Sequence, residues 1–145
     1  ITFKEKYSLL GEIDIVETIN EKSDELVTTI HYGHDYHRQI SKTTFLNQLT
    51  KLSNPIDHNK ISLIWEDKYF ELLLNDQLVF KVNFNEVENL EPNPFLEEFY
   101  LLINVAEGGN WPGTPNSTMY CNSRKSCPDV KKLIVDYIAY YEKIN

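Results

Sequence analysis

The sequence predicts an all-β protein, built as a sandwich or barrel of antiparallel strands. Short stretches rich in β-branched and aromatic residues recur along the chain, and turn-forming residues separate them. A length of 145 residues with 41% hydrophobic residues fits one globular domain, which we assign to residues 1–145. We therefore expect β-sheets that enclose a single hydrophobic core.

Two stretches near the start have the composition of strands. GEIDIVE (11–17) alternates polar and apolar residues, as a half-buried strand does. LVTTIHYG (26–33) is rich in β-branched and aromatic residues. We predict a strand over each stretch.

The middle of the chain predicts a series of hairpins. ISLIW (61–65) and KYFELLL (68–74) have the composition of paired strands with a break between them. Asn75-Asp76 then predicts a turn into QLVFKV (77–82), although the glycine that a type I′ turn favours is missing.

The last third contains two further predicted strands. FYLLINVA (99–106) is nearly all apolar, as a strand buried on both faces would be, and GGNWPGTPN (108–116) is a turn-rich loop. VKKLIVDYIAYYEK (130–143) is long enough for a helix, but its alternation and its many β-forming residues favour a strand.

Three carboxylates, Glu12, Asp14 and Glu17, lie within the first predicted strand. In a regular strand Glu12 and Asp14 share one face, whereas Glu17 points into the apolar layer, where an unpaired charge is costly. A β-bulge at Ile15 or Val16 would return Glu17 to the face of the other two acids. From the residues alone, a solvated strand edge, a catalytic carboxylate pair and a Ca²⁺ or Mg²⁺ site all stay open.

The charge and the cysteine content indicate which kinds of binding partner and which cellular compartment to expect. A formal net charge of -8 argues against nucleic acid and fits a neutral ligand better. No apolar run reaches the roughly 20 residues of a membrane span. Cys121 and Cys127 predict a local disulfide, and Asn116-Ser117-Thr118 is a glycosylation sequon, so we expect a secreted protein.

Four blocks of the sequence resemble glycoside hydrolase family 16, in its laminarinase-like (endo-β-1,3-glucanase) branch. GEIDIVE resembles the E-x-D-x-x-E signature in its bulged form, and TTIHYG (28–33) resembles the T-x-H-x-G strand that follows it. FYLLINVAEGGNWPGTPN (99–116) is similar to the apolar strand that ends in GGNWPG, and LIVDYIAYY (133–141) to the last strand. The blocks occur in the order of the family.

The resemblance implies a concanavalin A-like β-jelly-roll of two antiparallel sheets, with a glucan-binding cleft on its concave face. It implies a retaining endo-β-1,3-glucanase that hydrolyses laminarin-type or mixed-linkage β-glucan by double displacement. On matching positions, Glu12 is the nucleophile, Asp14 the assisting carboxylate and Glu17 the general acid/base. These roles agree with the expectation that neighbouring negative charges raise the pKa of Glu17.

Further matching positions imply substrate contacts and a metal. His31 matches a histidine near the carboxylates, while Asn110 and Trp111 match a cleft asparagine and tryptophan suited to sugar hydroxyls and to a pyranose ring. Each of these residues also has an ordinary structural role, in a strand, a turn or the core. Asp136 matches a position that sometimes holds structural calcium, although a salt-bridged or solvated aspartate is the favoured alternative at this position. No cofactor is required for the chemistry.

The resemblance covers only the later part of the family domain. In relatives several strands precede the signature. We therefore expect that a second chain or a precursor segment supplies the N-terminal strands, or that the fold is trimmed. The alternative function is a non-catalytic β-glucan-recognition protein of the same fold, and a transglycosylase would differ only in its acceptor. Retention of all three acids favours the enzyme.

Overall fold

The computed structural model describes residues 11–19, 22, 24–49, 58–106, 108–114 and 133–143. The chain divides into two compact units, Ile1–Phe99 and Tyr100–Asn145, and each is described by itself. Strands and short 3-10 helices make up the regular elements of the described residues. Within those residues, no helix is long and apolar enough to cross a membrane.

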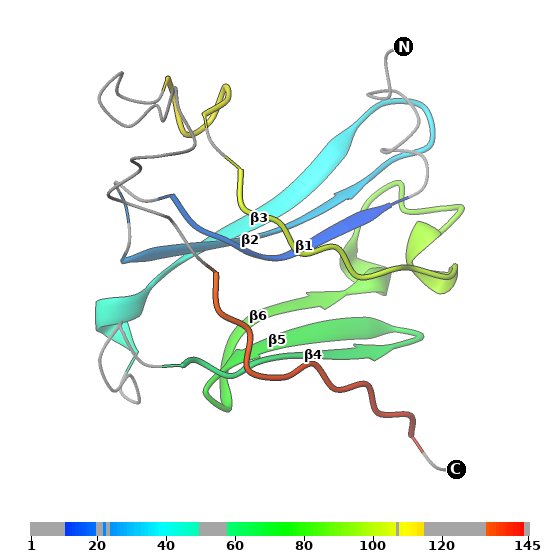
Figure 1. Ribbon diagram of the computed structural model, residues 1–145. Helices are drawn as coiled ribbons and strands as arrows, with labels where there is room; N and C mark the ends of the chain where they lie inside the picture. The colour runs from blue at the N-terminus through cyan, green and yellow to red at the C-terminus, as the bar shows by residue number, and fades with distance from the viewer. Residues whose placement is uncertain are drawn as a thin grey trace. The chain divides into compact units, whose positions relative to one another are not determined.

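The first sheet carries the acidic strand. Its strands are β1 (Glu12–Glu17), β2 (Glu25–Tyr32) and β3 (Arg38–Phe45), which pair antiparallel in the order β1-β2-β3 (Figure 1). The predicted strands at 11–17 and 26–33 are confirmed as β1 and β2. Strand β3 was not predicted.

The second sheet is built from two successive hairpins. Strands β4 (Ile61–Glu66), β5 (Tyr69–Leu74) and β6 (Gln77–Asn83) pair antiparallel in the order β4-β5-β6, as predicted. Asn75 and Asp76 have φ values of 50° and 67°, the signs that a type I′ turn requires. The Asn75 side chain accepts a hydrogen bond of 2.9 Å from the Lys60 backbone N–H, which supports the turn without a glycine.

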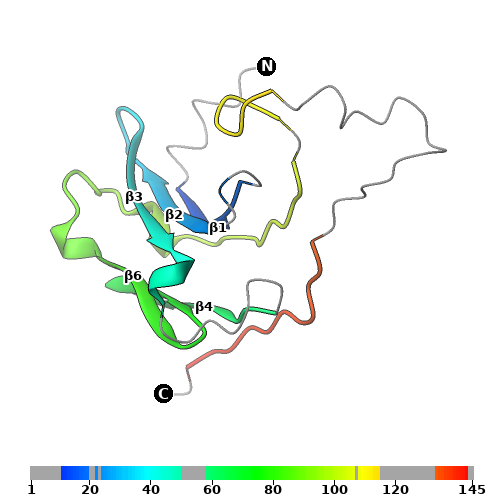
Figure 2. The same cartoon turned by 90° about the vertical axis from the view of Figure 1, so that its left-hand side faces the viewer.

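One hydrophobic core cluster contains residues from both sheets of the first unit. Figure 2 shows the ribbons of these two sheets from a second direction. Phe70 of β5 is fully buried, and its ring lies 5.9 Å from that of Phe80 and 5.8 Å from that of Phe84. Three 3-10 helices, η2 (Leu46–Gln48), η3 (Phe84–Glu86) and η4 (Pro94–Leu96), follow the strands. The buried hydrophobic residues of the core are Leu26, Ile30, Tyr32, Phe70, Leu72, Leu74, Val79, Phe80, Val82, Phe84, Leu90 and Phe95.

Two antiparallel sheets around a shared core confirm the predicted all-β sandwich. The prediction of strands at 99–106 and 130–143 is wrong for the parts of these stretches that the structure describes. Where the structure describes these stretches, at 99–106 and 133–143, they are not assigned as strands. Their sequences alternate or are apolar as strands are, but a strand also needs a hydrogen-bonded neighbour, and among the described residues neither stretch pairs with another strand. Apolar side chains there, such as Leu102 and Ile138, are exposed.

Candidate active site

A β-bulge in β1 places the three carboxylates on one face of the first sheet. Glu12 lies opposite His31 and Asp14 opposite Thr29, but Glu17 lies opposite Val27. The step from Asp14 to Glu17 therefore spans three residues on β1 and two on β2, which inserts the extra residue expected at Ile15 or Val16. Because residues directly opposite each other share a face, the register brings Glu12, Asp14 and Glu17 to the same surface.

Both residues of the bulge are held by the core side of the sheet. Ile15 and Val16 are partly buried and pack against the core cluster. The hydroxyl of Thr28, which is 2% exposed, donates a hydrogen bond of 3.1 Å to the backbone carbonyl of Ile15. This bond satisfies a carbonyl that the interrupted ladder leaves next to the apolar layer. The sequence did not identify Thr28 as important to the site.

The start of β1 is fixed against the helix η4. Gly11 has φ +76°, and a Cβ at this position would lie 2.9 Å from the Cβ of Pro94. A residue with a side chain would meet both the backbone restriction and this close contact. Gly11 therefore anchors the strand immediately before Glu12.

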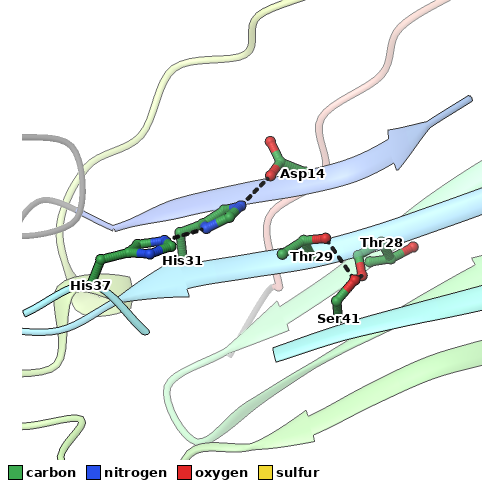
Figure 3. Close-up of polar contacts among 6 residues, drawn as sticks. All are labelled: Asp14, Thr28, Thr29, His31, His37 and Ser41. Carbon is green, nitrogen blue, oxygen red and sulfur yellow. Dashed lines mark hydrogen bonds and ion pairs between the residues drawn. The ribbon is translucent and has the colours of Figure 1, made fainter. Parts of the chain in front are cut away.

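His31 contacts the central carboxylate, as Figure 3 shows. Its Nε2 lies 2.9 Å from Oδ2 of Asp14, and the two side chains are 22% and 19% exposed. Burial lowers the pKa of His31, as does His37, while the charge of Glu12 opposes the shift. Because the pKa of Asp14 is raised and that of His31 is lowered, the neutral pair is favoured over the ion pair.

Burial and neighbouring negative charge raise the pKa values of Asp14 and Glu17. Burial raises the pKa of Asp14 to about 7 from 3.8, and the charges of Glu12 and Glu17, with a hydrogen bond to the Glu12 side chain, add to the shift. Burial also raises the pKa of Glu17, and the charge of Glu12 contributes. At neutral pH the cluster therefore retains protons that isolated carboxyls would lose.

Polar side chains continue this face across the sheet. Thr29 of β2 lies opposite Ser41 of β3, and their hydroxyl oxygens are 2.9 Å apart (Figure 3). Ser41 also donates a hydrogen bond of 3.4 Å to the backbone carbonyl of Thr28. A hydrogen-bonded pair of hydroxyls therefore lies beside the acids on this face. The sequence did not predict it, because β3 itself was not recognised.

Asn110 and Trp111 lie in a tight loop of the second unit. The backbone groups of Gly109 and Gly113 exchange hydrogen bonds of 3.2 and 3.0 Å, which close the loop around these two residues. The indole of Trp111 is 51% exposed, so its ring is available for stacking. Contacts of Asn110 and Trp111 with a glucan stay a prediction.

The remaining predicted site residues are not tested by the described structure. Asp136 is exposed in the second unit, and among the residues described no group of three or more metal-ligating side chains is placed to hold an ion. The calcium site stays a prediction. Cys121, Cys127 and Asn116 lie outside the described residues, so the disulfide, the glycosylation and secretion stay predictions as well.

No protein-family profile matches the chain. It is 26% identical over 137 residues to the clotting factor G alpha subunit of Tachypleus tridentatus, across 91% of this chain and 18% of that protein. It is 28% identical over 151 residues to the glucan endo-1,3-beta-glucosidase A1 of Niallia circulans, across 92% of this chain and 19% of that protein.

A solved structure of a laminarinase domain is also similar to this chain. The laminarinase catalytic domain from Thermotoga maritima MSB8, crystallised with cetyltrimethylammonium bromide, superposes with a TM-score of 0.63 at 26% identity. The match covers 77% of this chain and 45% of that domain. The resemblance to laminarinase-type glycoside hydrolases is thereby confirmed. The chain spans less than a fifth of the length of the two curated relatives named above.

Proposed function

We propose that this chain carries the catalytic acids of a retaining endo-β-1,3-glucanase that acts on laminarin-type or mixed-linkage β-glucan. The observation that carries the proposal is the bulge between Asp14 and Glu17, which returns Glu17 to the face of Glu12. The glucan endo-1,3-beta-glucosidase and laminarinase relatives support the substrate class.

In the proposed first step, Glu12 attacks the anomeric carbon while Glu17 protonates the departing glycosidic oxygen. The C–O bond to the leaving sugar breaks, and an ester bond forms between the carboxylate of Glu12 and the retained sugar. The exposed position of Glu12 and the raised pKa of Glu17 suit these two roles.

In the second step, Glu17, now ionised, takes a proton from a water molecule that attacks the same carbon. The ester bond to Glu12 breaks, and the sugar leaves with its original anomeric configuration. Both steps require the two carboxyl groups on opposite sides of the reacting carbon, about 5–5.5 Å apart in retaining glycosidases.

Asp14 is assigned a supporting role between the two reacting acids. With a pKa of about 7, its carboxyl holds a proton near neutrality and can donate a hydrogen bond to Glu12. A neutral Asp14 also avoids a third negative charge in the cluster, which would oppose the ionised state of the nucleophile.

The test is the release of reducing ends from laminarin by the wild-type protein and by Glu12→Gln and Glu17→Gln. We expect each variant to lose at least about 100-fold in rate, since positioned acid–base groups contribute about 10²–10⁴-fold. The matched control is Glu88→Gln, an exposed carboxylate in the turn after η3, which should retain wild-type activity.

Circular dichroism of each variant establishes that the fold is retained. Wild-type activity in both Glu12→Gln and Glu17→Gln would overturn the proposal. A wild-type protein that binds laminarin in a pull-down but releases no reducing ends would instead support the non-catalytic β-glucan-recognition protein.

A further inference from the structure

A second histidine, His37, contacts His31 on the side of the ring that faces away from Asp14. The Nε2 atom of His37 lies 2.7 Å from Nδ1 of His31, and the two rings are inclined by only 19° with their centroids 5.0 Å apart. Figure 3 shows Asp14, His31 and His37 in a continuous row. Each ring nitrogen of His31 therefore has a separate side-chain partner.

The loop between β2 and β3 is shaped to return His37 to His31. Gly33 has φ +123°, and a Cβ there would overlap the backbone carbonyl of Tyr36. Asp35 accepts hydrogen bonds from the Tyr36 N–H at 3.0 Å and from the Arg38 guanidinium at 2.7 Å. Arg38 also lies 3.7 Å from the centre of the Tyr36 ring. These contacts order the loop around an otherwise exposed histidine.

The row of Asp14, His31 and His37 permits only proton arrangements in which each hydrogen bond has one donor and one acceptor. A neutral imidazole donates from one nitrogen and accepts at the other. If Asp14 is protonated and donates to Nε2 of His31, Nδ1–H must donate to His37. If His31 instead donates from Nε2 to Asp14, which is then ionised or donates its own proton to Glu12, Nδ1 of His31 must accept from Nε2–H of His37. The direction of the hydrogen bond between Asp14 and His31 is therefore linked to the proton on His37.

We propose that His37 is a positioning residue that fixes the tautomer of His31 and thereby couples the proton on Asp14 to solvent. The inference rests on the proposed function only in its effect on catalysis, because the linkage itself is a property of the three side chains. A protonated His37 can only donate, so it favours the arrangement in which His31 donates to Asp14, and such a hydrogen bond stabilises the ionised carboxylate.

Other charged groups near Asp14, His31 and His37 also influence where the protons lie in this row of side chains. Glu12 and Glu17 lie beside Asp14 on β1, and their negative charges favour the protonated carboxyl. In the loop, Asp35 is paired with Arg38, and the two charges offset each other close to His37. His34 is exposed in the same loop and serves as the matched control.

The experiment uses two variants of the full chain. His37→Phe keeps an aromatic ring but has no ring nitrogen, and His37→Gln keeps a hydrogen-bonding group that does not titrate. Long-range ¹H–¹⁵N spectra of the imidazole rings report the tautomer of His31 directly. We expect one dominant His31 tautomer in the wild type near neutral pH and a mixture in His37→Phe. In His37→Gln, whose amide can donate or accept, the tautomer should follow Asp14 alone.

Glucanase kinetics provide the second measurement. We expect His37→Phe to lower kcat about 3- to 10-fold, the worth of roughly one hydrogen bond, with KM little changed and the pH profile shifted. His34→Phe should leave both the spectra and the kinetics as in the wild type.

The two measurements separate failure of this inference from failure of the proposed function. If the wild-type protein is inactive but His37→Phe still redistributes the His31 tautomers, the proposed glucanase function is overturned and the linkage is supported. Unchanged ¹⁵N shifts of His31 in both His37 variants overturn the inference, whether or not the protein is active.

Discussion

The hydroxyl of Thr28 donates a hydrogen bond of 3.1 Å to the backbone carbonyl of Ile15, and this bond ties β2 to the bulge of β1. Thr28 faces the buried side of the sheet, whereas the acids occupy the other side. The direction in which Glu17 points therefore depends on a side chain that has no part in the chemistry.

Replacement of Thr28 by valine is expected to lower the free energy of unfolding by about 1–3 kcal/mol. Valine has nearly the same shape, but it leaves the Ile15 carbonyl without a partner next to the core. Urea denaturation measures the effect, and Thr28→Ser should recover most of the loss. Thr43→Val, which changes an exposed threonine of β3, is the control. Equal stability of Thr28→Val and the wild type would show that the bulge does not need this bond.

Asp14 should make the protein less stable as the pH rises toward neutrality. Its folded pKa of about 7 lies above the ordinary value of 3.8, so its contribution is fully present below pH 4 and is lost as the pH passes through 7. One pKa unit corresponds to about 1.4 kcal/mol, so even a much smaller shift is measurable.

Asp14→Asn should therefore flatten the dependence of the urea midpoint on pH between 4 and 7. At higher pH the variant should be more stable than the wild type, because it has no buried carboxylate to ionise. Asp67→Asn, in the exposed turn between β4 and β5, should follow the wild-type curve. Parallel curves for Asp14→Asn and the wild type would contradict the assignment.

Removal of the Glu12 charge should lower the pKa values of both neighbouring acids. The charge of Glu12 raises the pKa of Asp14 and of Glu17, so Glu12→Gln removes one cause of each shift. Carbon-13 NMR titration of the side-chain carboxyl groups measures both. Burial still raises the two values, so they should remain above those of ordinary carboxyls. Unaltered titration of both acids in Glu12→Gln would show that the three groups are not coupled.

The sequence predicted the features that follow from local pattern and from the cost of burying charge. A regular strand would have placed Glu17 in the apolar layer, so a bulge between Asp14 and Glu17 was the alternative that avoids this cost, and the register contains it. The hairpins of the second sheet were predicted in the same way, from alternation and from the turn residues Asn75 and Asp76.

Features that depend on distant partners were not predictable in this way. Strand β3 (RQISKTTF) has few apolar residues and was missed, because its place in the sheet comes from pairing along the whole length of β2. The stretch 99–106 shows the opposite case, since it has a strand composition but pairs with no other strand among the residues described. His37 lies six residues from His31, which in a continuous strand would separate the two residues by about 20 Å, and only the fold of the loop brings the rings together.

The stereochemistry of the first product tests the central claim most directly. Double displacement through Glu12, with Glu17 as acid and then base, predicts that hydrolysis of laminarin first releases the β-anomer, with the α-anomer appearing later by mutarotation. Proton NMR of the anomeric signals during the first minutes of reaction distinguishes the two. Initial release of the α-anomer would mean direct attack by water and would contradict the assignment of Glu12 as nucleophile.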